Sequence, residues 1–145
     1  MAKKEVGEFG TIYTQFKNRP KEAIKHLKKV KEGECVNALY RKEIGYVDII
    51  WGVPGTKKND YLDGFGLAHI IAKHGKELKQ LGFEVEDFIP IVFAFGKISI
   101  NTNTCKIFLD GETFRLIIKT TWNEAPKRYV LTAYDLRPIT NKRKK

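Results

Sequence analysis

The segment from Gly64 to Gly75 holds the side chains best suited to acid–base chemistry. It places His69 and His74 five residues apart, in a chain that has only three histidines. Histidine is the side chain whose ordinary pKa lies close enough to neutrality both to give and to take a proton. Two histidines in one short element of a basic chain therefore suggest acid–base chemistry on an anionic substrate.

The spacing of the two histidines argues against a metal site. Residues five apart on an ideal helix project about 140° from one another, whereas the histidines of a zinc protease motif lie four apart and face one ion. We expect a helix over residues 67–74, with His69 pointing inward or toward a cleft. His74 would occupy the last turn, before a capping Gly75. The alternatives are a core histidine at position 69 and a purely capping histidine at position 74.

Hydroxyl and basic side chains gather on two strands predicted near the end of the chain. Strand alternation places Thr132 and Tyr134 on one face of the last strand. The preceding strand offers Arg115, Lys119 and Thr121 in one register. Such groups can bind a phosphate. The alternative is an ordinary half-exposed pair of strands with solvated charges.

The charge balance favours a polyanionic partner. Lys and Arg total 27 against 17 Asp and Glu, which gives a formal net charge of +10. This excess suits nucleic acid or an anionic membrane face, and a soluble protein that is simply basic is the alternative. The first predicted helix could follow an RNA backbone with five lysines: Lys21, Lys25, Lys28, Lys29 and Lys31.

The length and the spacing of turn signals predict one domain. The 145 residues fit a single unit, with an irregular lead-in over 1–18, the domain over 19–139 and a disordered basic tail over 140–145. Pro20 and Gly33 suit the ends of a first helix, and a second packed helix is expected over 85–95. No apolar run reaches the roughly 20 residues that span a bilayer. Strands are predicted over 35–41, 46–51, 97–101, 106–109, 113–121 and 128–134.

Three segments resemble a family of phage- and toxin-associated nuclease domains. They are Trp51-Gly52, the stretch from Gly66 to Gly75, and the closing stretch from Tyr129 to Tyr134. The family is grouped with barnase, EndoU, colicin-type tRNases and RelE as the BECR superfamily. The resemblance implies an α+β ribonuclease domain, with N-terminal helices packed on a curved antiparallel, mainly four-stranded sheet.

The same resemblance implies RNA cleavage without a metal or other cofactor. By position, His69 and His74 match the family's helix histidines, and Thr132 and Tyr134 match the polar pair on its last strand. A basic residue is expected where this chain has Ala68, so one phosphate contact is missing. We expect RNA phosphates to be bound by Arg115, Lys119, Lys73 and Thr121.

These inferences converge on an endoribonuclease toxin domain acting in the bacterial cytoplasm, free or as the C-terminal part of a larger secreted or phage-borne toxin. The 2′-hydroxyl of RNA would attack the phosphate and leave a 2′,3′-cyclic phosphate. The expected partners are an RNA substrate, with tRNA as one candidate, and an acidic immunity protein or antitoxin; membrane insertion is not expected. The alternative function is a non-catalytic nucleic-acid-binding module, such as a phage accessory protein.

Overall fold

The computed structural model describes residues 5–59, 61, 63–80, 82 and 84–135. Its strands are β1 (Glu5–Gly7), β2 (Gly10–Tyr13), β3 (Glu34–Arg41), β4 (Gly45–Ile50), β5 (Lys97–Asn101), β6 (Lys106–Asp110), β7 (Phe114–Trp122) and β8 (Ala125–Asp135). Its helices are α1 (Pro20–Val30), the short 3-10 helix η1 (Lys57–Asn59), α2 (Gly66–Gln80) and α3 (Val85–Phe95). The strands form one eight-stranded sheet in the order β1-β2-β3-β4-β8-β7-β6-β5.

This sheet corrects the predicted architecture. The expected four-stranded antiparallel sheet is wrong, because eight strands pair and two neighbouring pairs, β2/β3 and β4/β8, are parallel. The helices are not gathered at the N-terminus: α1 separates β2 from β3, while α2 and α3 lie between β4 and β5. The missed β1 and β2 lie in the expected irregular lead-in, and with three and four residues they are too short to show alternation.

Much of the local prediction is confirmed. Helix α1 begins at Pro20 and α3 spans the predicted residues with Pro90 inside it. The closing meander β5–β8 is antiparallel and sequential, as the turn signals indicated. The predicted basic tail over 140–145 lies outside the described residues.

Helix α2 is longer than predicted, which changes the setting of His74. The helix continues through Gly75 to Gln80. Residues 76–80 favour helix by propensity, and Leu78 adds an apolar anchor that is only 2% exposed. Gly75 is therefore not a helix cap, and His74 lies in mid-helix rather than in the last turn.

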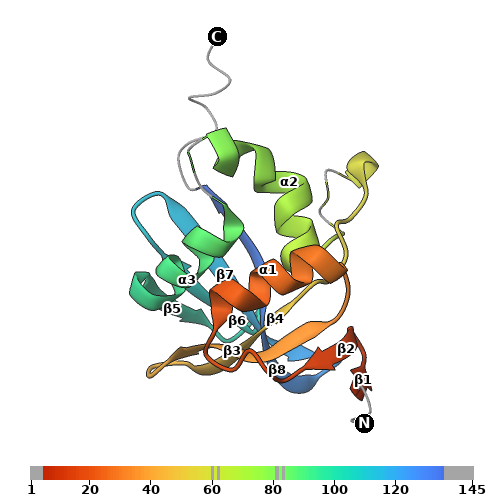
Figure 1. The fold of residues 1–145 in the computed structure, drawn as a ribbon. Helices are drawn as coiled ribbons and strands as arrows, with labels where there is room; N and C mark the ends of the chain where they lie inside the picture. Colours follow the sequence, from red (N-terminus) through yellow and green to blue (C-terminus); the bar gives the residue numbers. More distant parts are fainter. Residues whose placement is uncertain (1–4, 60, 62, 81, 83, 136–145) are drawn as a thin grey trace.

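The three α-helices close one core with the sheet (Figure 1). Helix α1 buries Ala23, Ile24 and Leu27, and α3 buries Phe88 and Phe93. Helix α2 packs mainly on β8 and touches β4 and α3 as well. This packing fixes the histidine helix against the strand that carries Thr132 and Tyr134. Among the described residues, no helix is long and apolar enough to cross a membrane.

Two lysines on the lysine-rich face of α1 form ion pairs with acidic residues at the start of α3. Lys21 forms an ion pair with Asp87 at 3.3 Å. Lys28 approaches Glu86 at 2.9 Å and Glu84 at 3.5 Å. These pairs tie α1 to the start of α3, so this face has less charge for an RNA backbone than the sequence suggested.

The sheet has a narrow seam between β4 and β8. In the part of the chain that the structure describes, the register of these two strands contains one residue pair, Asp48 and Tyr129. Lys127 fastens this seam, because its Nζ lies 2.6 Å from Glu34 Oε1 and 2.7 Å from Asp48 Oδ2. Burial alone would lower the pKa of Lys127, but the hydrogen bonds to Asp48 and Glu34 raise it above the usual value. Glu34 is only 4% exposed, so without Lys127 its carboxylate would be buried without a cationic partner.

Lys127→Met should therefore destabilise the fold strongly. Removing one partner of a buried ion pair leaves an uncompensated charge and costs about 3–5 kcal/mol. Urea unfolding followed by circular dichroism measures the loss, and Lys25→Met on the exposed face of α1 is the matched control, expected to change stability by no more than about 0.5 kcal/mol. Adding Glu34→Gln to Lys127→Met should recover part of the loss. Equal stability of the two single variants would contradict the role given to Lys127.

Candidate active site

The start of α2 is pinned to the end of β4. Val53 and Phe65 form an isolated antiparallel bridge, with N–H···O distances of 3.0 and 2.9 Å. The N–H of Ala68 then donates to the carbonyl oxygen of Trp51 at 2.8 Å. These bonds hold the first turn of the histidine helix in place, and the bridge between Val53 and Phe65 closes the loop that precedes it.

Two glycines allow the backbones to meet at this junction. Gly52 has φ +72°, and a Cβ there would lie 2.1 Å from the carbonyl oxygen of Phe65. Gly66 has φ +81°, and its Cβ would lie 2.9 Å from the carbonyl oxygen of Trp51. Only glycine combines this conformation with so close an approach. The Trp51-Gly52 and Gly66 motifs of the sequence are therefore the residues that attach the start of α2 to the end of β4.

His69 lies inside the molecule, behind the closed loop. Its side chain is 6% exposed, and its Nδ1 has no hydrogen-bond partner among the described residues. Burial lowers the pKa of His69 below its ordinary value, and the charge of Lys73 lowers it further. The backbone carbonyls of Pro54 and Tyr61 act in the opposite direction without reversing the shift. The net effect favours the neutral form of the His69 imidazole.

His74 joins this buried ring to the surface. Its ring centroid lies 6.1 Å from that of His69 at an angle of 86° and 5.9 Å from that of Tyr134 at 39°. The side chains of His74 and Tyr134 are both partly exposed. A spacing of five residues thus brings the two imidazoles into contact, and strand β8 supplies a phenol to the same group.

A β-bulge in β8 sets the orientation of the polar pair. The register passes from Ile117↔Thr132 to Ile118↔Val130, which leaves Leu131 as the extra residue. Strict alternation would place Val130 on the face of Thr132, but Val130 is buried at 1% exposure on the core side. Thr132 and Tyr134 keep a common face. The Oγ1 of Thr132 is buried and has no partner within the described part of the chain.

Arg115 lies directly across from Tyr134 on strand β7. Its Nε and Nη2 donate to Asp110 Oδ1 and Oδ2 at 2.7 and 2.9 Å, and its guanidinium lies 4.9 Å from the centroid of the Phe108 ring. The hydrogen bonds to Asp110, with a smaller contribution from Tyr134, raise the pKa of Arg115 above its usual range. The guanidinium is thus held rigidly beside the phenol.

Of the other expected phosphate-binding residues, the structure places one near the two histidines and two far along β7. Lys73 lies close enough to His69 to lower its pKa. Lys119 donates to the carbonyl oxygen of Thr104 at 3.1 Å, and Thr121 pairs with Pro126 near the start of β8. At about 3.3 Å per residue, these two positions lie roughly 13 and 20 Å along the strand from Arg115. They do not join the cluster around His74.

The candidate active site thus consists of His69, Lys73, His74, Tyr134 and Arg115, with Thr132 adjacent on β8. Sequence reasoning missed Asp110, which anchors Arg115. A carboxylate directly opposite Arg115 in the antiparallel register of two predicted neighbouring strands could have indicated the ion pair. Among the described residues, no group of three or more His, Cys, Asp or Glu side chains could hold a metal ion.

Comparison with protein families places these residues in context. Residues 38–139 match the family described as phage-Barnase-EndoU-ColicinE5/D-RelE like nuclease 1, PBECR1. The chain belongs to this nuclease family. The PBECR1 match includes all the candidate residues and excludes β1, β2 and α1. No curated protein and no solved structure matches the chain.

The buried His69 should make the stability of this PBECR1 protein depend on pH. Its folded-state pKa lies below the unfolded value, near 6.5, so the unfolded chain binds more protons as the pH falls through that value. The free energy of unfolding should therefore fall toward acid pH, by up to about 1.4 kcal/mol per pH unit for one proton. Denaturant unfolding of wild type and His69→Gln at several pH values measures this term. Identical pH dependence in the two proteins would contradict it.

Proposed function

We propose that this PBECR1 protein is a metal-independent endoribonuclease. The observation that carries the proposal is the position of His74, which contacts both His69 and Tyr134 while Arg115 lies across from the phenol. Groups that can move protons and a fixed cation thus meet in a chain of a nuclease family. RNA brings its own nucleophile in the 2′-hydroxyl, so these groups supply what the reaction lacks.

The chemistry requires two proton transfers. As the 2′-oxygen forms its bond to phosphorus, a base takes the 2′-hydroxyl proton; as the bond from phosphorus to the 5′-oxygen breaks, an acid protonates that oxygen. His74 is partly exposed, so it is the imidazole that can meet the substrate, with Tyr134 as its proton-transfer partner. His69 is buried, so we assign it a position behind His74. There a neutral ring adds no charge that would repel the protonated form of His74.

The developing negative charge needs fixed donors. Preorganised cations near a pentacoordinate phosphorane stabilise it more than they stabilise the ground state. Arg115 is fixed by Asp110 and lies beside Tyr134. Lys73 lies on the same helix as both histidines and influences His69. We assign phosphate stabilisation to these two cations, with Thr132 orienting the substrate.

Purified protein should cleave RNA in the presence of EDTA and leave a 2′,3′-cyclic phosphate. His74→Ala should lower the rate by about 10²–10⁴-fold, the usual cost of losing an acid–base group. Tyr134→Phe removes the phenolic hydroxyl and keeps the aromatic ring, so it tests the role of the hydroxyl alone. His26→Gln is the matched histidine control, because His26 packs on Tyr13 and Phe16 away from the candidate active site.

Two results would contradict the mechanism. A substrate with a 2′-deoxyribose at the cleavage position should resist the enzyme, so its cleavage would exclude attack by the 2′-hydroxyl. A strict requirement for Mg²⁺ would exclude activation by side chains alone. Tight RNA binding without turnover would instead support the non-catalytic nucleic-acid-binding module.

We further propose that the enzyme is a toxin restrained by an acidic protein that covers His74, Tyr134 and Arg115. The net charge of +10 favours fast, electrostatically steered association with such an inhibitor. Expression of the wild type in bacteria should arrest growth, whereas His74→Ala at equal soluble level should not. Normal growth with abundant folded, RNA-cleaving protein would contradict the toxin role.

A further inference from the structure

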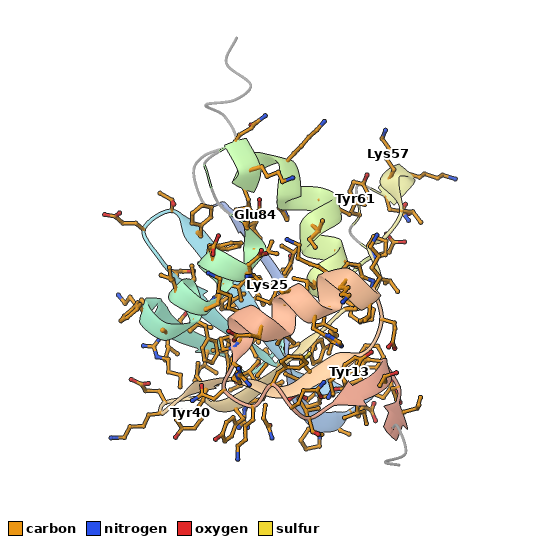
Figure 2. The ribbon with its side chains drawn as sticks, viewed as in Figure 1. Tyr13, Lys25, Tyr40, Lys57, Tyr61 and Glu84 are labelled. Atoms are coloured by element: carbon orange, nitrogen blue, oxygen red, sulfur yellow. The ribbon has the colours of Figure 1, made fainter. Side chains whose placement is uncertain are left out.

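Two exposed tyrosines form a pair on the β3/β4 hairpin. Tyr40 and Tyr46 lie directly opposite in the strand register, with ring centroids 4.7 Å apart and an interplanar angle of 51°. Their exposed fractions are 48% and 37%. In Figure 2, Tyr40 lies at the lower edge of the molecule, far from Tyr61 and Lys57 in the loop beside α2. This tyrosine platform lies on β3 and β4, whereas the candidate active site is built from α2, β7 and β8.

Cations flank the tyrosine platform. The Nζ of Lys17 lies 5.2 Å from the centroid of the Tyr46 ring. The Nη1 of Arg128 lies 3.9 Å from the point that a Cβ on Gly45 would occupy, so its guanidinium is adjacent to the residue before Tyr46. Exposed aromatic rings beside basic side chains are the combination that binds unpaired bases and their phosphates.

A polar cavity of about 250 Å³ adjoins the platform. Its lining includes Tyr46 and Arg128, together with Asn37, Asp48, Thr120 and Lys127. The acidic member, Asp48, is already engaged: its Oδ1 accepts from the N–H of Asn37 and its Oδ2 from Lys127, both at 2.7 Å. The Asp48 charge is thus offset within the protein, and exposed Arg128 adds positive charge to the cavity.

We propose that the tyrosine platform binds single-stranded RNA. A base stacks on Tyr40, Tyr46 supports that ring from the neighbouring strand, and Arg128 and Lys17 bind adjacent phosphates at the mouth of the cavity. Single strands are favoured because stacking on a side chain requires an unpaired base. The proposal rests on the proposed function in taking RNA as the substrate, and it adds a contact away from the bond that is cut.

A second contact of this kind changes the substrate preference of the enzyme. Once one part of a long RNA binds the platform, the rest is held at high effective concentration near the candidate active site. A dinucleotide cannot reach both places. The platform should therefore lower KM for long single-stranded RNA and leave cleavage of a dinucleotide unchanged.

Fluorescence anisotropy with a 2′-O-methyl single-stranded oligonucleotide tests binding without cleavage. Tyr40→Ala should weaken binding about tenfold, within the range found for one stacked base, and Tyr40→Phe should retain it because the ring remains. Phe95→Ala is the matched control, since Phe95 is an exposed aromatic residue, at 82%, on α3. Arg128→Ala and Lys17→Ala should each reduce the dependence of log affinity on log salt by about one. A duplex of the same sequence should not distinguish Tyr40→Ala from wild type.

The outcomes separate this proposal from the proposed function. Equal binding by Tyr40→Ala and Phe95→Ala would overturn the platform, whether or not the protein cleaves RNA. Loss of binding in Tyr40→Ala by a protein that never cleaves RNA would support the platform and overturn the endoribonuclease. If Tyr40→Ala abolished binding of a protein partner while RNA affinity stayed at the wild-type level, the surface would be a protein interface and the proposal would be wrong.

Discussion

The narrow pairing of β4 with β8 is the constraint on which the rest of the structure depends. Among the described residues, β4 and β8 pair in register at Asp48 and Tyr129, and the ammonium of Lys127 binds a carboxylate on β3 and another on β4. Helix α2 packs beside this seam on β8. The histidines of α2 and the phenol of β8 therefore meet only while the two halves of the sheet stay joined.

The contrast between His69 and His74 shows how one helix can provide two different environments. Burial lowers the pKa of His69, whereas the partly exposed His74 can reach solvent. On the sheet, Arg115 is held in place by its bidentate bond to Asp110. Its guanidinium therefore has little conformational freedom left to lose when it binds a phosphate. The site is built from groups that the fold has already immobilised.

Local pattern was sufficient to predict α1, α3, the separate strands β3 and β4 and the closing meander, because each depends on nearby turn residues and apolar periodicity. Pairing between distant segments was not predictable in this way. Nothing in the composition of β4 and β8 shows that they align in parallel, and β1 and β2 are too short to show a pattern. For the candidate site, residue types identified His69, His74 and Tyr134, while the separation of Lys119 and Thr121 from Arg115 follows from strand length. The bulge at Leu131, which turns Val130 to the core, is a register effect that alternation alone misses.

Glu34 lies just outside the family match but forms part of the ion-pair cluster that joins β3, β4 and β8. The PBECR1 match begins at residue 38, so Glu34 lies before it, as do β1, β2 and α1. A protein cut at that boundary would keep all the candidate catalytic residues, yet Lys127 would retain only Asp48 as a carboxylate partner. It would also lose the helix that buries Ile24 and Leu27 against the sheet. In this chain the segment that matches the family is therefore packed against N-terminal elements outside the match, and a graft of that segment alone onto another protein would lack these contacts.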